Sequence, residues 1–348
     1  METQIMHMTE GIDPVMIRQA GEILKAGGLV AFPTETVYGL GGDALNPDSS
    51  RKIYAAKGRP SDNPLIVHIC RLGDLETIAA DIPQAAFTLA EHFWPGPLTM
   101  ILRRKDIVPR ETTGGLDTVA VRFPSHPIAM ELIRAGGGFI AAPSANISGR
   151  PSPTLPSHVV EDLSGRVDVI IDGGTVGIGL ESTIIDLTAA EPVILRPGYI
   201  TQEMLSALFF NVKIDPGLLS DDSSVRPKAP GMKYRHYAPK AELTIVEGSD
   251  DAVTAYINEQ IRLLAAEGKK TGVLCTDENR SRYCGGIIQS AGSRQDERSI
   301  ALHLYETLRI FDSLQADIIY AESLDTPVMG QAIMNRLIKA AGHRIIHV

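Results

Sequence analysis

Residues 28–44 read GLVAFPTETVYGLGGDA, and this stretch decides the fold of the first half of the chain. The apolar run 29–32 predicts a buried strand, and a polar turn follows it at once. Upstream, apolar residues recur at helical spacing until glycines end the helix, at Ile17, Ala20, Ile23 and Leu24, then Gly27 and Gly28. Helix, strand and polar loop in this order predict an α/β fold, and the Gly-rich and Pro-rich loops up to about residue 200 favour a mixed sheet.

The polar turn after this strand is a candidate binding loop. Gly39, Gly41 and Ala44 fit GxGxxA formally, but residues 33–38 intervene where a dinucleotide-binding fold turns directly into its helix. More informative are the polar residues 34–36, because ligands of α/β proteins commonly bind at the carboxyl ends of strands. An ordinary polar turn is the alternative.

The second half of the chain alternates strands and helices. The strands are expected at 243–246, 272–275, near Ile287 and at 318–321, and the helices at about 250–266, 300–314 and 330–341. This alternation predicts a parallel sheet in a smaller, Rossmann-like α/β domain. The domain has no phosphate-binding fingerprint, so we expect a regulatory or structural role for it.

A basic segment, RPKAPGMKYRHYAPK at 226–240, separates the two halves. Its five Lys or Arg and three Pro, without an acid, predict an extended linker. The predicted boundaries are 13–205 for the first domain, 206–240 for the linker and 241–348 for the accessory domain. A solvated tether is the alternative reading of the linker, but Tyr234, His236 and Tyr237 are more than a tether needs.

Composition restricts the class of protein. The 348 residues carry 33 basic and 42 acidic side chains, and the net charge of -9 argues against coating nucleic acid through bulk charge. Three cysteines without a CxxC pair favour a reducing compartment. The start, METQIMHMTEG, lacks signal-peptide features, and no apolar run approaches the roughly 20 residues that span a bilayer. We therefore expect a cytoplasmic protein without membrane association.

A basic motif, KGRPSDNPLIVHI at 57–69, predicts an anion site. We expect a short helix at about 50–56 and then an extended segment that projects Lys57 and Arg59 on the same side, with an anion between them. A solvated basic turn is the competing interpretation. Asn63 and His68 lie close by in the sequence, which favours an anion site over a solvated turn. A lone His in an apolar strand, however, is more often a core residue.

Three further segments carry polar residues at strand ends. In the segment FIAAPSANISGRPSPT at 139–154, an apolar strand is followed by a loop rich in hydroxyl and amide side chains. Such a loop can bind phosphate or ribose oxygens, and the alternative is that these are ordinary turn residues. GLESTIIDL at 179–187 places Ser182 at the start of a strand, and ILRPG places Arg196 at the end of one. In DTVAVRFP, Thr118 and Arg122 share one face of a strand. No motif for covalent or metal-ligand catalysis accompanies them, so these loops predict anion binding and positioning.

The motifs KGRPSDNPLIVHI, SANISGRPSPT, ESTIID and LRPG, in this order, resemble the YrdC-like family, specifically the long threonylcarbamoyl-AMP synthases with a linker of the type PGMKYRHYAP. The resemblance implies a twisted open mixed sheet with a concave, locally positive face. It also implies a nucleotidyltransferase that joins L-threonine, bicarbonate and ATP into L-threonylcarbamoyladenylate and releases pyrophosphate. Other proteins, the threonylcarbamoyl-transferases, then modify an adenosine of tRNA.

Family roles carry over to matching positions. The threonine contacts implied are Thr36, His68, Arg122, Ala142 and Ser182. The ATP contacts implied are Arg59, Asn63, Thr118, Ser144, Ser152, Arg196 and Tyr234. Lys57 and Arg59 are the expected catalytic cations, Mg²⁺ is expected to arrive with ATP without protein ligands, and no prosthetic group is expected. The linker is expected to close over the nucleotide through Tyr234.

Two other functions are compatible with parts of the sequence. One is carbamoyl-adenylate formation, as in YrdC-like modules of hydrogenase maturation factors, although the additional domains of those larger chains are absent here. The other is a noncatalytic module that binds tRNA or double-stranded RNA, for which a local basic patch is available at Arg103, Arg104, Lys105 and Arg110.

Overall fold

The computed structural model describes residues 2–208, 211–215 and 236–348, and the chain divides into two compact units. The second unit runs from residue 236 to the end and also takes in residues 149–151 and 178–180, which come from loops of the first half. The first unit holds the remaining described residues. The domain boundaries 13–205, 206–240 and 241–348 stay predictions.

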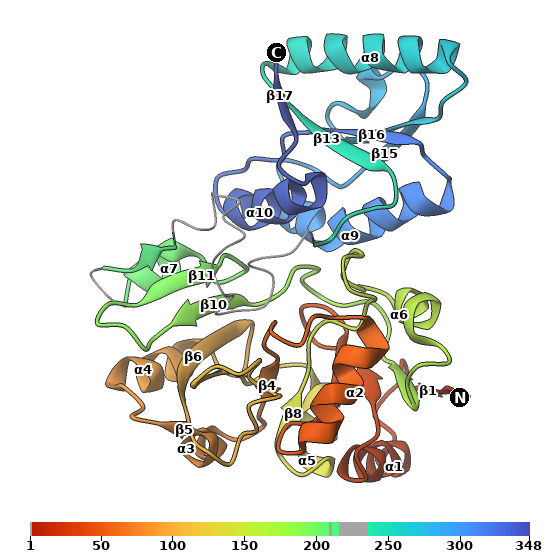
Figure 1. Cartoon of the computed structure of the whole chain (residues 1–348). Coiled ribbons are helices and arrows are strands. Elements are labelled where there is room, and N and C mark those ends of the chain that lie inside the picture. The colour runs from red at the N-terminus through yellow and green to blue at the C-terminus, as the bar shows by residue number, and fades with distance from the viewer. Residues whose placement is uncertain (1, 209–210, 216–235) are drawn as a thin grey trace. The chain divides into compact units, whose positions relative to one another are not determined.

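The first unit is built on one large mixed sheet (Figure 1). Its strands are β1 (Gln4–His7), β2 (Val30–Phe32), β3 (Gly39–Asp43), β4 (Ile66–His68), β5 (Ala79–Ala80), β6 (Leu98–Arg104), β7 (Thr118–Arg122), β8 (Ile140–Ala141), β9 (Val169–Asp172), β10 (Thr183–Asp186), β11 (Val193–Arg196) and β12 (Lys213–Ile214). They lie in the order β1-β9-β2-β3-β8-β4-β7-β6-β10-β11-β12, with β5 beside β6. The sheet contains parallel pairs, such as β4 and β7, and antiparallel pairs, such as β6 and β7, which confirms the predicted mixed sheet.

Short helices connect these strands. They are α1 (Pro14–Lys25), α2 (Pro47–Lys57), α3 (Leu75–Ile78), α4 (Gln84–Phe93), α5 (Pro127–Ala135), α6 (Pro156–Leu163) and α7 (Gln202–Ser206). The helix predicted ahead of residue 27 is α1, which begins at its cap Asp13, whose carboxylate accepts hydrogen bonds from two backbone amides of the first turn. Glycine ends this helix as the sequence predicts, since Gly27 takes a φ of 79°.

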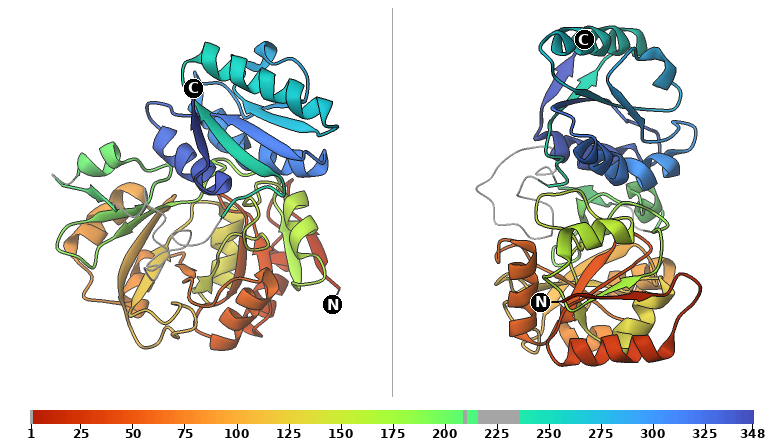
Figure 2. Two further views of the ribbon diagram at one scale, coloured as in Figure 1. Left: turned by 45° about the horizontal axis from the view of Figure 1, so that its top comes forward. Right: turned by 90° about the vertical axis from the view of Figure 1, so that its right-hand side faces the viewer.

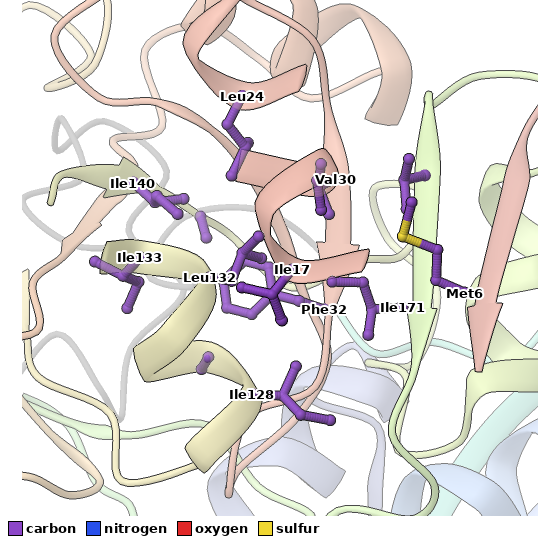
Figure 3. Close-up of a cluster of buried hydrophobic side chains, with 14 of the residues drawn as sticks. Met6, Ile17, Leu24, Val30, Phe32, Ile128, Leu132, Ile133, Ile140 and Ile171 are labelled. Atoms are coloured by element: carbon purple, nitrogen blue, oxygen red, sulfur yellow. The ribbon is translucent and has the colours of Figure 1, made fainter. Parts of the chain in front are cut away.

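Helices α1 and α5 pack side by side against the sheet and enclose the main core of the first unit. Figure 3 shows Ile17 and Leu24 of α1 and Ile128 and Leu132 of α5 in one cluster with Phe32 of β2. These side chains are at most 5% exposed. Burying each such side chain contributes about 1.5–3 kcal/mol, so this layer fixes the strands whose ends carry the polar loops.

The second unit is a parallel sheet in the order β15-β14-β16-β13-β17. Its elements are β13 (Glu242–Glu247), α8 (Asp250–Ala266), β14 (Thr271–Cys275), the 3₁₀ turn η3 (Arg280–Arg282), β15 (Ile287–Ser290), α9 (Glu297–Ser313), β16 (Ile318–Glu322), α10 (Gly330–Ala341) and β17 (Ile345–His347). Helix α8 covers one face, and α9 and α10 cover the other (Figure 1; Figure 2, right). The predicted smaller, Rossmann-like α/β domain is confirmed. In the described ranges no helix is long and apolar enough to cross a membrane.

Candidate active site

A row of polar side chains crosses three neighbouring strands of the first unit. His68 at the end of β4 pairs in register with Arg122 at the end of β7, and Arg122 pairs with Thr99 near the start of β6. Partners in register project from the same face of a sheet, so the three side chains lie next to one another. Ile66 and Ala120 lie two residues before His68 and Arg122 on the same two strands, so they project from the same face. Both belong to a buried apolar cluster. The polar row therefore borders a buried apolar surface.

Arg122 connects the row to the loop that follows β2. Its guanidinium is 5% exposed and donates from Nη1 to Thr36 Oγ1 at 3.0 Å and from Nε to the Gly96 carbonyl at 3.4 Å. Its Nη2 lies 2.7 Å from Glu35 Oε1, which places a carboxylate against the buried cation. The loop itself is held by Thr34, whose Oγ1 donates to the Val37 carbonyl at 2.6 Å. Residues 34–36 are thus more than a solvated turn.

His68 is a neutral member of the row. Burial, together with the positive charge of Arg122, lowers the pKa of His68 to about 3. Its Nδ1 lies 3.1 Å from the Ile66 carbonyl, and the edge of its ring meets Phe32. A neutral imidazole beside a buried guanidinium provides a hydrogen-bonding group without adding a second positive charge.

Ser182 and Arg196 extend the row onto β10 and β11. Ser182 Oγ lies 2.7 Å from Thr99 Oγ1, and Arg196 Nη2 donates to the same Ser182 oxygen at 3.2 Å. Arg196 Nε also donates to the Ser182 carbonyl at 3.0 Å. Because β10 lies parallel to β6 and antiparallel to β11, these three residues from distant parts of the sequence are held in one hydrogen-bonded chain.

The predicted side-by-side arrangement of Lys57 and Arg59 is wrong. Lys57 is the last residue of α2, and Gly58 reverses the chain with a left-handed φ of 61°. Lys57 is 1% exposed and donates to the carbonyl oxygens of Ser144 and Asn146 at 2.5 Å each. Arg59 points instead into its own loop. Neither cation is solvated, so the basic-turn alternative is also wrong.

Arg59 and Asn63 form one local unit. Arg59 Nη2 donates to Asn63 Oδ1 at 2.7 Å and to the Pro64 carbonyl at 3.0 Å, and Arg59 Nε donates to the Asn63 carbonyl at 3.1 Å. Both side chains are buried. The loop 59–64 is therefore shaped around the guanidinium, which fixes its direction.

Backbone hydrogen bonds tie the polar loops of the first unit together. Tyr38 donates its amide to the Pro153 carbonyl at 2.9 Å and accepts from the Ala145 amide at 2.8 Å. The Ser148 amide donates to the Lys57 carbonyl at 2.9 Å. The loops after β2, α2 and β8 consequently converge, as the sequence predicts for a shared site.

The structure places the predicted threonine contacts in or beside the row. Thr36, His68, Arg122 and Ser182 belong to the connected set, and Ala142 follows β8 with its amide donating to the Ile66 carbonyl at 2.9 Å. Among the predicted ATP contacts, Thr118 begins β7 on the face of Arg122, and Ser144 lies on the loop that Lys57 holds. The remaining ones pair within the first unit: Arg59 with Asn63, Ser152 with Glu181, and Arg196 with Ser182. Tyr234 lies outside the described residues, and all these roles stay predictions.

Sequence reasoning missed three participants. Thr99 bridges the row to Ser182, and Glu181 accepts a 2.5 Å hydrogen bond from Ser152 Oγ. His126, at the cap of α5, is half-buried, and the charge of Glu35 acts on it. Only the Glu181 position carried a signal, since it lies in the quoted ESTIID motif. Thr99 and His126 sit in stretches that show no motif.

Comparison with known proteins defines the class. The family model named for Sua5, YciO and YrdC and described as "Telomere recombination" matches residues 22–198. A second, described as "Threonylcarbamoyl-AMP synthase, C-terminal domain", matches residues 200–342. The chain belongs to the Sua5–YciO–YrdC family, in the form that carries this second domain.

Relatives match over nearly the whole chain. A Pyrococcus abyssi protein named threonylcarbamoyl-AMP synthase is 48% identical over 99% of this chain and 100% of its own. A Bacillus subtilis protein of the same name is 49% identical over 96% of this chain and 95% of its own. The crystal structure of P. abyssi Sua5 complexed with L-threonine superimposes with a TM-score of 0.94 at 48% identity, covering 99% of this chain and 100% of that one.

Proposed function

We propose that this chain makes L-threonylcarbamoyladenylate and pyrophosphate from L-threonine, bicarbonate and ATP, for the threonylcarbamoyladenosine modification of tRNA. As a reaction class this is nucleotidyl transfer. The observation that carries the proposal is the connected polar row, which contains four of the five predicted threonine contacts, in a chain similar along its length to threonylcarbamoyl-AMP synthases.

The chemistry suits a site made of positioning groups. The threonine amine takes up bicarbonate to give an N-carboxy species, and the new carboxylate attacks the α-phosphorus of ATP while pyrophosphate leaves. Both reactants are anions, and aligning them supplies about 7–11 kcal/mol through proximity. Preorganised cations such as Arg59 and Arg196 are each expected to contribute roughly 3–4 kcal/mol to stabilising charge on phosphate. We expect Mg²⁺ to arrive bound to the phosphates of ATP.

Lys57 acts in this proposal through the loop it organises. Its ammonium is directed at backbone carbonyls of the loop that carries Ser144, a predicted ATP contact. A buried ammonium held by several acceptors fixes that loop more firmly than turn propensity alone. Lys57 is therefore a positioning residue for the nucleotide, whereas Arg59 and Arg196 remain the candidates for direct phosphate contact.

The chemistry is assigned to the first unit. A Pseudomonas putida protein named threonylcarbamoyl-AMP synthase is 34% identical over 97% of its own length but covers only 52% of this chain. A protein of this length thus carries the same name without a counterpart of nearly half of this chain, and we propose that the second unit serves regulation or stability. Transfer of the product to downstream threonylcarbamoyl-transferases and a contact with tRNA are further parts of the proposal.

Pyrophosphate release tests the proposal. The protein is incubated with ATP, Mg²⁺ and bicarbonate, with L-threonine, with L-serine or without amino acid. We expect release that depends on both bicarbonate and L-threonine and is weaker with L-serine. Release that is indifferent to threonine would reject the assignment.

A further inference from the structure

Three buried polar atoms in the row still have unused hydrogen-bonding capacity. Within the described residues, Glu35 Oε1, Glu35 Oε2 and Arg122 Nη2 have no hydrogen-bond partner, although Oε1 and Nη2 lie 2.7 Å apart as an ion pair. The N–H groups of Arg122 Nη2 do not point at the Glu35 carboxylate at an angle that makes a hydrogen bond. The two groups thus attract each other as charges, and each keeps hydrogen-bonding capacity that the other does not use.

Such an arrangement points to a ligand. Buried polar groups are almost always hydrogen-bonded, because an unmade bond leaves the desolvation of the group uncompensated. The Glu35 side chain is 14% exposed, while its two carboxylate oxygens are buried. On its other sides Arg122 is fixed by Thr36 and by the Gly96 carbonyl. The unused hydrogen-bonding capacity therefore suits a ligand that offers both a donor and an acceptor.

We propose that Glu35 receives the α-ammonium group of the amino-acid substrate and takes its proton, next to Arg122, which the family resemblance already implies as a threonine contact. This rests on the proposed function and names the base that the reaction requires. A zwitterionic α-amino acid carries a cationic donor and an anionic acceptor on one carbon, which complements a carboxylate and a guanidinium nitrogen side by side.

The substrate enters as R–NH₃⁺ and cannot attack carbon, because its nitrogen lone pair is used in an N–H bond. One N–H bond breaks, its proton moves to Glu35 Oε2, and the electron pair stays on nitrogen. The free amine then forms the N–C bond with the bicarbonate carbon, water leaves, and the carbamate remains as the nucleophile. Glu35 returns its proton to solvent before the next turnover.

The groups around Glu35 favour this role. Arg122 on β7 keeps positive charge against the carboxylate, and neutral His68 on β4 adds none. Among the described residues, the titratable His126 at the start of α5 also senses Glu35; burial lowers the pKa of His126, while the charge of Glu35 opposes that shift. Its Nδ1 has no partner in the part of the chain that the structure describes.

The competing explanation is that Glu35 only neutralises Arg122. A carboxylate retained for that purpose alone is expected to bind the guanidinium through aligned N–H groups, because isolated buried ion pairs with poor geometry do not stabilise a fold. The two explanations differ in what a neutral amide does. Neutralisation predicts a loss of stability, whereas a base predicts a rate defect that depends on the protonation of the substrate.

The test uses the full-length protein and its Glu35→Gln variant, with Glu131→Gln as control. The Glu131 side chain is 45% exposed and pairs with Arg134 on α5, so the control removes one negative charge away from the row. We measure kcat/KM for L-threonine, KM for ATP and Tm from pH 6.5 to 9.5. Since a general base typically contributes 100-fold or more, we expect at least a 100-fold lower kcat/KM for threonine at pH 7.5 in Glu35→Gln.

The pH profile separates the explanations. As pH rises towards the pKa of the substrate amine, more threonine arrives unprotonated, so Glu35→Gln is expected to recover by about tenfold per pH unit, with KM for ATP unchanged. A wild-type rate in Glu35→Gln, or a loss that is independent of pH, overturns the inference. Wild-type protein without threonine-dependent pyrophosphate release instead overturns the proposed function.

A second variant keeps the inference testable if Glu35→Gln does not fold. Glu35→Asp retains the charge beside Arg122 but withdraws the carboxylate by one methylene. We expect a lower kcat/KM for threonine without the recovery at high pH, because a base is still present. An unchanged kcat/KM in Glu35→Asp contradicts direct contact with the substrate.

Discussion

The buried His68 makes stability depend on pH in a way that can be calculated. Its folded-state pKa of about 3 lies below the ordinary value of 6.5, so the folded protein keeps the ring neutral where the unfolded chain protonates it. Above pH 6.5 the ring is neutral in both states, so the folded state keeps its full stability. As pH falls from 6.5 towards 3, only the unfolded chain binds the proton, and the free energy of unfolding decreases. Between pH 7 and pH 5 the unfolded state gains about 2 kcal/mol from this one group.

The perturbation is the replacement His68→Gln, which removes the titration while keeping a polar side chain. We expect wild-type protein to lose about 2 kcal/mol more unfolding free energy than the variant between pH 7 and pH 5, a difference of roughly 4–8 °C in Tm for a unit of this size. Thermal and urea unfolding of the full chain at both pH values measure it. His92→Gln, at an exposed histidine on α4, is the control and should follow wild type. Equal pH dependence in wild type and His68→Gln would refute the account of a buried neutral ring.

Three further replacements test how the site loops are held. Gly58→Ala forces a left-handed φ of 61° on a residue with a Cβ and should lower the free energy of unfolding by about 1 kcal/mol. Gly73→Ala is the control, because a Cβ there also meets no atom within 4 Å, and its Tm should stay closer to wild type. Lys57→Met leaves loop carbonyls unpaired and should lower unfolding free energy by about 3 kcal/mol and raise KM for ATP; an unchanged KM would show that the loop does not position nucleotide. Ser182→Ala removes the oxygen that Arg196 binds, so we expect a cost of about 1–2 kcal/mol and a higher KM for threonine in steady-state assays, and an unaltered KM would count against the row.

Much of the fold could be predicted from local patterns. The alternating strands and helices after residue 240 gave the parallel second unit, since a parallel connection needs a crossover and the helices supply it. In the first unit, α1 and β2 follow from apolar spacing and a glycine stop. The order of the strands in the large sheet could not be derived in this way, because neighbours such as β6 and β10 are joined through long sequence separations.

The site was predictable as a set of loops but not as a set of contacts. Strand-end positions identified Arg122 and Ser182, yet the bridge between them through Thr99 depends on the register of β6 against both β7 and β10. The error at Lys57 has a simple cause: one left-handed glycine turned an expected extended segment into a helix end. Spacing rules assume a regular backbone, and a single positive φ invalidates them.

Isotope labelling of the product tests the central claim most directly. The protein is incubated with L-threonine, ATP, Mg²⁺ and either ordinary or carbon-13 bicarbonate, and the nucleotides are separated and weighed by mass spectrometry. The account predicts a threonine-dependent adenylate that becomes one mass unit heavier with the label, accompanied by an equal amount of pyrophosphate. An adenylate of threonine that carries no bicarbonate carbon, or no adenylate at all, would contradict it.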